Sequence, residues 1–394
     1  MIDQVANAFK RKDYKTAAHL LKQLVKQEPQ NPWVKLYIGQ LQEIRGKEEV
    51  AEAIYRRLLQ ETTHPKVMSQ ARLGVKRLVA REQERREEAL RKALTDPNNT
   101  QLGVLVLEPI NVEAKQVAAQ KLASIMGIDA YTARLQLPTR GWRLYRIGPV
   151  GELQFYASEL QKESIPCLWV TLADVEKINV FNVNSFSPTE REENEATALT
   201  ATVFCHNLHN QLSSLTFNWS EVAQRVEGFV PLFEKVLDID VRRKLQRKTQ
   251  TLDYVQFCDL HLTGRGIILR LCDRHLRWRY SRDQHHQSQP KTAFSPVQQN
   301  KPSEEQKESL LNQGTTRRSW NNLLEFLNRQ LPEIPVWSDF TIFAETAIDY
   351  QEMLGRLNSH IDLFRLEETP WDSAFQLYSS LVMLKSQSER SNLK

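Results

Sequence analysis

The sequence predicts an α+β protein with a helical N-terminal region, a β-rich centre and a helical C-terminal part. Three observations indicate this order. Over residues 1–95 the apolar residues recur at helical spacing, and similar residues stand 34 positions apart. Over residues 100–282, short apolar runs alternate with turn-forming Gly, Pro, Asn and Asp, as is typical of strands. A polar tract at 283–317 then precedes a second helical pattern at 318–394.

Length and composition are those of a globular chain with several domains. Of 394 residues, 41% are hydrophobic and 26% are charged. No apolar run approaches the roughly 18 residues of a membrane-spanning helix, and residues 1–4 lack the basic start of a secretory signal. Four cysteines occur without a close CxxC pair, which is typical of reduced thiols. We therefore expect a cytoplasmic protein without membrane insertion.

The N-terminal region has the spacing of repeated helical hairpins. Ala17 and Ala51 lie 34 residues apart, and so do Leu21 and Tyr55. Gly39 and Ala51 fall where antiparallel helices must approach closely, because a larger side chain would wedge them apart. This interval predicts stacked helix-turn-helix units, an architecture that docks other chains.

This pattern resembles the tetratricopeptide repeat family. The matching residues are Ala17, Leu21 and Pro29 in a first repeat and Ile38, Gly39, Ala51 and Tyr55 in a second. Leu73 and Gly74 indicate a third unit displaced by one residue. The resemblance implies a groove on which Lys10, Gln40 and Glu43 hold a peptide. A generic stack of helical hairpins is the alternative.

Residues 100–175 predict a ferredoxin-like βαββαβ module. Strands are expected at 102–110, 130–137, 142–146 and 165–172, with helices at 112–126 and 152–162. This order places the helices over one face of an antiparallel sheet. Many RNA binders use such a module, but the aromatics of 142–146 lack the order of the RNA-recognition signature. We therefore interpret 142–146 as a strand whose aromatics pack under a neighbouring domain.

Residues 176–282 predict a β-rich extension that ends in a basic hairpin. Strands are expected at 178–186, 199–206 and 212–218, followed by a helix at 219–236. Segments 258–262 and 272–276 are near copies of each other around the turn 263–266. Two such runs separated by a glycine-containing turn predict a β-hairpin.

The Asp and His residues of this hairpin are candidate ligands for a divalent metal. Asp259 and His261 share one face of a strand, as do Asp273 and His275. In the expected register, however, Asp259 and His261 lie opposite leucines rather than opposite further ligands. We therefore interpret them as buried groups that satisfy each other's hydrogen bonds, and we predict no metal and no cofactor.

Basic residues gather in two parts of the chain. Residues 1–95 hold 20 Lys and Arg against 12 Asp and Glu, and residues 240–282 hold 11 against 4. The second part contains a candidate polyanion site: Arg242, Arg243, Lys244, Arg247, Lys248, Arg277 and Arg279. Basic and aromatic residues alternate over 274–282, a pattern that can contact phosphates and stack bases. The alternative is an exposed strand, or a basic surface that faces the acidic C-terminal region.

Residues 283–317 and 318–394 contain no catalytic or ligand-binding motif. Residues 283–317 are rich in Gln, Ser, Lys and Asn and are expected to be a disordered linker, and 318–394 are expected to be helical. No nucleotide-binding glycine loop is present and no catalytic residue is predicted. The sequence thus predicts a non-enzymatic scaffold or adaptor that binds another protein or peptide. The alternative is an RNA- or DNA-binding protein that uses residues 242–282, and a metal-dependent hydrolase at the Asp/His hairpin is a third hypothesis.

Overall fold

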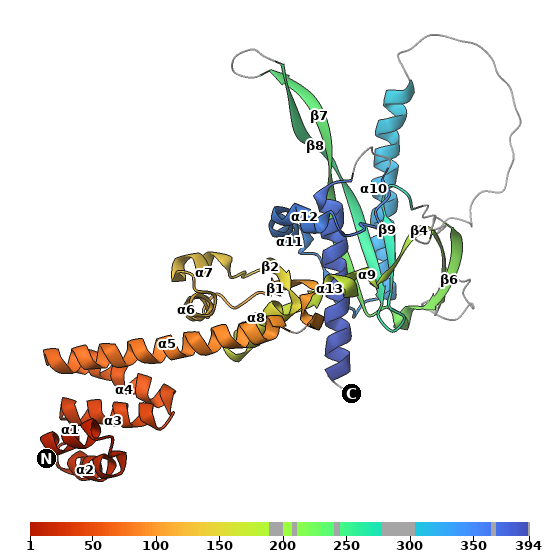
Figure 1. Cartoon of the computed structure of the whole chain (residues 1–394). Coiled ribbons are helices and arrows are strands. Elements are labelled where there is room, and N and C mark those ends of the chain that lie inside the picture. Colours follow the sequence, from red (N-terminus) through yellow and green to blue (C-terminus); the bar gives the residue numbers. More distant parts are fainter. Residues whose placement is uncertain are drawn as a thin grey trace, which may run out of the picture. The chain divides into compact units, whose positions relative to one another are not determined.

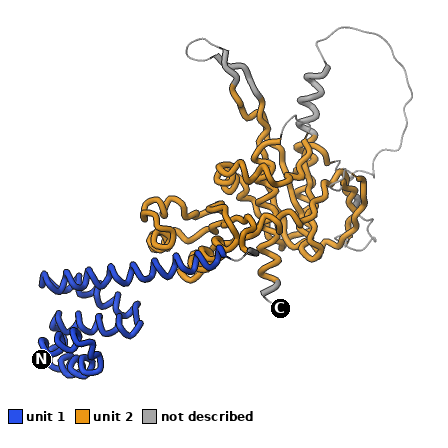
Figure 2. The backbone as a smooth tube through the Cα atoms, in the orientation of Figure 1, with its two compact units in different colours: residues 1–96 blue, residues 97–394 orange. Residues whose placement is uncertain are grey.

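A computed structural model describes residues 1–95, 97–188, 200–206, 211–239, 245–276, 304–363 and 368–392 (Figure 1). The chain divides into two compact units, residues 1–96 and residues 97–394 (Figure 2). The predicted α+β class is confirmed, with helices at the N-terminal end, two sheets in the centre and helices at the C-terminal end.

The first unit consists of helical hairpins, as expected. Its helices are α1 (Ile2–Lys10), α2 (Tyr14–Gln27), α3 (Pro32–Ile44), α4 (Glu48–Glu61) and α5 (Pro65–Thr95). The starts of the helices follow local chemistry. Asp13 caps α2 by accepting a hydrogen bond from the Thr16 amide at 3.1 Å, and Asn31 caps α3 by accepting from the Trp33 amide at 3.0 Å. Pro32 occupies the first turn of α3, where no N–H is needed.

Small residues let the helices of this unit pack closely, as the spacing predicted. The Tyr55 ring of α4 is wedged between two glycines. A Cβ on Gly39 would come within 2.7 Å of Tyr55 Cε1, and a Cβ on Gly74 within 2.5 Å of Tyr55 Cε2. Both distances are shorter than any van der Waals contact allows, so these two positions require glycine. Ala51 is likewise fully buried in the core of the unit.

The second unit begins with a small sheet covered by helices. Its elements are η1 (Pro97–Thr100), β1 (Leu102–Leu107), α6 (Lys115–Met126), α7 (Ala130–Gln136), β2 (Arg143–Pro149), α8 (Val150–Lys162), β3 (Cys167–Thr171) and α9 (Leu172–Glu176). The strand order is β2-β1-β3, with both neighbours antiparallel to β1.

The prediction of a strand at 130–137 is wrong, because helix α7 occupies this segment. Asp129 caps this helix by accepting from the Thr132 amide at 2.9 Å. Ala133 and Leu137 are both buried here. They lie four residues apart, a spacing that is typical of a helix and not of a strand. The module therefore has three strands in the order β-α-α-β-α-β instead of the four strands of a ferredoxin-like βαββαβ unit.

The larger sheet of the second unit has the order β10-β7-β8-β9-β4-β5-β6 among the described residues. Its strands are β4 (Asn179–Pro188), β5 (Thr200–His206), β6 (Leu212–Asn218), β7 (Gln224–Ile239), β8 (Leu245–Leu262), β9 (Ile267–Cys272) and β10 (Val336–Trp337). The predicted hairpin is confirmed as β8 and β9, which pair antiparallel. β4 pairs parallel with β9, and β10 pairs parallel with β7.

The prediction of a helix at 219–236 is also wrong. Only the short turn η2 (Trp219–Glu221) is helical, and strand β7 follows. Within β7, Pro231 has no N–H to donate to a helix, and Gly228 destabilises a helix by about 1 kcal/mol relative to alanine. A Cβ on Gly228 would lie 2.6 Å from Phe375 Cε2, so this glycine marks a close approach of the strand to a C-terminal helix.

The C-terminal helices are α10 (Glu304–Gln330), α11 (Phe340–Ala347), η3 (Ile348–Tyr350), α12 (Gln351–Leu354) and α13 (Pro370–Asn392). Residues 304–317 belong to α10, which corrects the expectation that the linker extends to 317. The remainder of that expected linker, 283–303, lies outside the described residues. No helix in the described part of the chain is both long enough and apolar enough to cross a bilayer.

The two sheets of the second unit are held together by the C-terminal helices. In β1, Val104 and Val106 pack into the core that contains α11 and α13, whereas Leu105 and Leu107 pack against α6, α7 and α8. The larger sheet likewise has two covered faces. One packs against α11 and α13 through residues such as Phe257, and the other packs against α10 through residues that include Cys258, Leu260 and Leu271.

Candidate protein-docking site

One face of α3 carries partly exposed apolar and amide side chains. Trp33, Tyr37, Gln40 and Ile44 stand at i, i+4, i+7 and i+11, so they lie on one stripe of the helix. The first three are partly buried, and Ile44 is 45% exposed. The predicted site residue Gln40 therefore lies within this stripe.

Neighbouring elements extend the stripe into a row of rings, named here the aromatic row. It comprises Tyr14, Phe9, Tyr37, Trp33 and His64. The Tyr37 ring stacks on Phe9 with centroids 5.2 Å apart and on Trp33 with centroids 6.2 Å apart. Tyr14 meets Phe9 edge-on at 6.1 Å, and His64 meets Trp33 edge-on at 5.5 Å. The row thus runs from α2 and α1 across α3 to the residue before α5.

Charged groups flank the aromatic row. Lys10, the second predicted site residue, is exposed at the last position of α1, directly after Phe9. Burial, followed by the charge of Asp3, raises the pKa of the Tyr37 hydroxyl above its usual value. That hydroxyl therefore remains protonated at neutral pH and keeps a hydrogen to donate.

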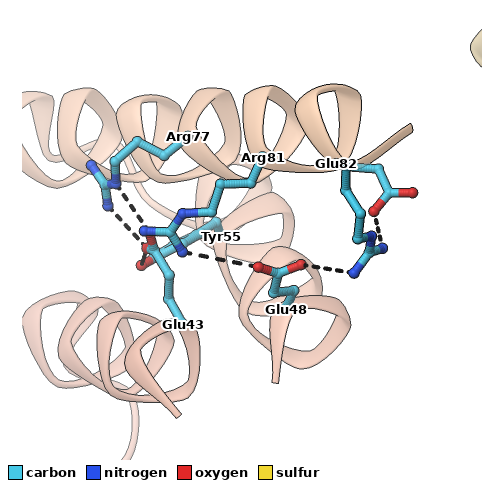
Figure 3. Close-up of polar contacts among 7 residues, drawn as sticks. Glu43, Glu48, Tyr55, Arg77, Arg81 and Glu82 are labelled. Carbon is cyan, nitrogen blue, oxygen red and sulfur yellow. Dashed lines mark hydrogen bonds and ion pairs between the residues drawn. The ribbon is translucent and has the colours of Figure 1, made fainter. Parts of the chain in front are cut away.

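Glu43, the third predicted site residue, points into the unit instead (Figure 3). It is 7% exposed, and the Tyr55 hydroxyl donates to its Oε2 at 2.9 Å. Arg77 donates from Nε to Oε1 at 3.1 Å and from Nη2 to Oε2 at 3.0 Å, and Arg81 lies 3.5 Å away. The carboxylate thereby joins α3 to α4 and α5, and a peptide would have to displace these partners to reach it.

The electrostatics of this cluster keep the Glu43 carboxylate ionised. Burial would raise its pKa, but the hydrogen bonds from Arg77 and Tyr55 and the charges of Arg77 and Arg81 together outweigh burial, and the pKa lies below the usual value. The pKa of Tyr55 is raised by burial and by its bond to Glu43. At the rim of the cluster, Glu48 is 4.0 Å from Arg81 and more exposed than Glu43 (Figure 3).

The residues of the predicted polyanion site are described only in part. Arg242, Arg243, Lys244, Arg277 and Arg279 lie outside the described residues. Arg247 and Lys248 are in β8, opposite Leu237 and Val236 of β7, and Lys248 is exposed.

The ribbon of β7 and β8 exposes apolar side chains that the sequence analysis missed. Figure 1 shows the two strands continuing beyond the rest of the sheet. Phe229, Phe233, Leu252 and Tyr254 are between 39% and 68% exposed on them. Large apolar side chains in a strand are normally buried under a further layer of structure. The sequence alone therefore does not indicate that these four side chains are exposed.

The Asp/His hairpin forms a buried polar cluster. Asp259 lies opposite Arg270 and His261 opposite Ile268, which corrects the expected register opposite leucines. Arg270 donates to Asp259 at 2.9 and 2.7 Å, and both side chains have no exposed surface. Asp273 and His275 follow the end of β9, in the turn after it.

Helix α13 completes this cluster. The Ser379 hydroxyl donates to Asp259 Oδ2 at 2.6 Å, and it lies 2.9 Å from His261 Nε2. Burial lowers the pKa of His261 to about 4, so the ring is neutral at physiological pH. The serine stands between the histidine and the aspartate, whereas a nucleophilic triad needs the histidine in the middle. Among the described residues, no three metal-ligating side chains are grouped closely enough to hold an ion.

Comparison with known proteins identifies one part of the chain. Residues 8–73 match the family model of the tetratricopeptide repeat. No curated protein and no solved structure matches the chain. The matched residues contain Gly39, Tyr55 and the aromatic row. The N-terminal region of this chain is therefore a tetratricopeptide repeat-like region.

Proposed function

We propose that this chain is a non-enzymatic adaptor that binds another protein or peptide through its N-terminal unit. The observation that carries the proposal is the aromatic row, whose five rings come from three helices and the residue before α5 and stay partly open to solvent. Aromatic rings supply a large contact area and lose little rotamer freedom on binding, and they are enriched at interfaces. Repeats of this family are protein-interaction modules, which supports the same conclusion.

The charge of the unit favours an acidic partner. Lys and Arg outnumber Asp and Glu by 20 to 12 over residues 1–95. Lys10 stands beside the row, whereas Glu43 is occupied inside the unit. We therefore propose a partner segment with apolar side chains for the row and a carboxylate for Lys10, while Glu43 maintains the spacing of the helices. Because two hairpins and one further helix make a small surface, affinity from this surface alone is expected to be modest.

Affinity capture with the full chain tests the proposal. The partner that is recovered should be purified and titrated against the wild type, Lys10→Glu and Tyr37→Ala, with folding checked by circular dichroism. Both variants should weaken binding. Phe229→Ala is the matched control, because it removes an exposed ring from the other unit. Equal affinity for the wild type, Lys10→Glu and Tyr37→Ala would exclude this surface as the docking site.

A nucleic-acid-binding role for the β7–β8 ribbon is the second candidate. It is favoured by the exposed rings of Phe229, Phe233 and Tyr254 on the ribbon that also carries Arg247 and Lys248, two residues of the basic segment 242–248 of the sequence. Titration with single-stranded RNA at two salt concentrations tests it, because phosphate contacts make affinity fall steeply with salt. If the affinity for RNA changes neither with salt nor in the Tyr254→Ala variant, this candidate function is excluded. The expected cytoplasmic location stays a prediction.

A further inference from the structure

A cavity of about 490 Å³ lies in the second unit, whereas the aromatic row belongs to the first. Its walls come from β4, β8, β9, the end of β5 and the segment before α13. The volume is within the range of roughly 300–1,000 Å³ that is usual for small-molecule sites. Most of its lining side chains are polar, although it is built on the face of the sheet that elsewhere forms the apolar core.

An irregularity in β4 concentrates polar side chains at this cavity. Val183 pairs with Cys205 and Ser185 pairs with Phe204, so Asn184 is an extra residue in the ladder. In a regular strand, neighbouring side chains point to opposite faces. Here Asn184 and Ser185 both line the cavity. A bulge that turns an additional side chain toward a concave site is a common feature of functional sites.

The hydrogen bonding of the lining residues defines which groups face a ligand. The Asn184 amide nitrogen lies 2.7 Å from His206 Nδ1. Since an amide nitrogen only donates, Nδ1 accepts, and the neutral ring carries its proton on Nε2. Asn182 adds a second amide from the same strand. The cavity therefore offers donors and acceptors side by side.

The interior of the cavity carries little net charge. The buried Arg270 lines it, but its guanidinium is already paired with Asp259 through two hydrogen bonds. Burial lowers the pKa of His275, although the charge of Asp362 acts in the opposite direction. The lowered pKa favours the neutral imidazole. Asp362 is exposed and lies at the edge. A buried phosphate or carboxylate would need a cation that is not already neutralised.

We propose that this cavity binds a neutral polyhydroxylated molecule of the size of a mono- or disaccharide. Two asparagine amides, the serine hydroxyl and the His206 imidazole match neighbouring sugar hydroxyls, each of which both donates and accepts. Phe257 and Ile361 supply apolar surface for the C–H face of a sugar ring.

Ligand-observed NMR and calorimetry with the full chain test this assignment. The probes are D-glucose, D-galactose and maltose, together with adenosine and inorganic phosphate. We expect at least one saccharide to bind, with an affinity that barely changes between low and high salt, because no net charge is neutralised. Asn184→Ala should weaken that binding about tenfold, the equivalent of one or two hydrogen bonds.

Two further variants keep the test decisive. Ser185→Ala removes one cavity hydroxyl with little effect on folding, so it replaces Asn184→Ala if the latter unfolds. Thr202→Val is the matched control, because that hydroxyl is exposed and bonds to Thr216 at 2.8 Å. The proposal is overturned if no saccharide binds, if binding is unchanged in both cavity variants, or if only adenosine or phosphate binds.

Discussion

The carboxylate of Glu43 provides the sharpest test of how the repeat unit is held together. Its two oxygens accept hydrogen bonds from Tyr55 on α4 and from Arg77 on α5, while Glu43 belongs to α3. The change Glu43→Gln keeps the size and shape of the side chain and removes the charge. It also turns an NH2 group toward one of the former donors, so at least one of these bonds is lost.

The expected cost follows from the partners. A hydrogen bond to a charged group contributes roughly 1.5–3 kcal/mol, against about 0.5–1.5 kcal/mol between neutral groups. The bond from the buried Tyr55 therefore weakens by about 1 kcal/mol. Arg77 is 46% exposed, so water screens its ion pair and we assign it no more than about 1 kcal/mol. The sum is a loss of about 2 kcal/mol in the free energy of unfolding of the unit.

Glu48→Gln is the matched control for this change. Glu48 carries the same charge on the same unit, but it is 32% exposed and lies 4.0 Å from Arg81 and 3.8 Å from Arg85. Such loose surface pairs contribute about 0.5 kcal/mol or less. Amide hydrogen exchange of the full chain resolves the opening free energy of α3, α4 and α5 separately from that of the second unit.

The acid dependence gives an independent check. The folded pKa of Glu43 lies below its ordinary value of 4.5, so the unfolded state binds more protons in acid. The stabilisation is complete above pH about 4.5 and is lost as the pH falls through the folded pKa. The difference between wild type and Glu43→Gln should shrink accordingly. If exchange in α3–α5 responds no more to Glu43→Gln than to Glu48→Gln, the assignment of Glu43 as an internal tie is wrong.

Three further predictions concern the second unit. Asp259→Asn should destabilise it by about 3–5 kcal/mol in denaturant unfolding, since Arg270 would lose its buried counter-charge; a loss below about 1 kcal/mol would contradict the pairing. Gly228→Ala should cost about 1–3 kcal/mol because its Cβ would press on Phe375 and Phe340, whereas Gly264→Ala, which meets nothing within 4 Å, should be nearly neutral. The pKa of His261 is about 4 in the folded state and 6.5 ordinarily, so between these pH values the unfolded state binds more protons than the folded state. The contribution of His261 to the free energy of unfolding therefore rises with pH across this range, by up to about 3 kcal/mol. Unfolding of wild type and His261→Gln at several pH values measures this contribution, and a difference that does not change with pH would refute it.

Short-range patterns in the sequence determined the repeat unit and the β8–β9 hairpin. Gly39 and Ala51 could be recognised because close helix packing excludes larger side chains wherever it occurs. The copies at 258–262 and 272–276 predicted the hairpin because a turn between two similar strands is a local feature. The repeat position of Gln40 predicted that it lies on a groove-lining helix, and Gln40 belongs to the partly exposed stripe of α3.

The tertiary structure alone decided what faces each of these residues. Glu43 turns inward because Arg77, 34 residues away on another helix, supplies the opposite charge. Gly228 of strand β7 faces Phe375 because α13, distant in the sequence, packs against this strand. Asp259 meets Arg270 because the hairpin closes with a register that no local pattern specified. A periodicity tells which side chains share a face, but burial and the neutralisation of charge depend on partners distant in sequence, so only the folded chain reveals them.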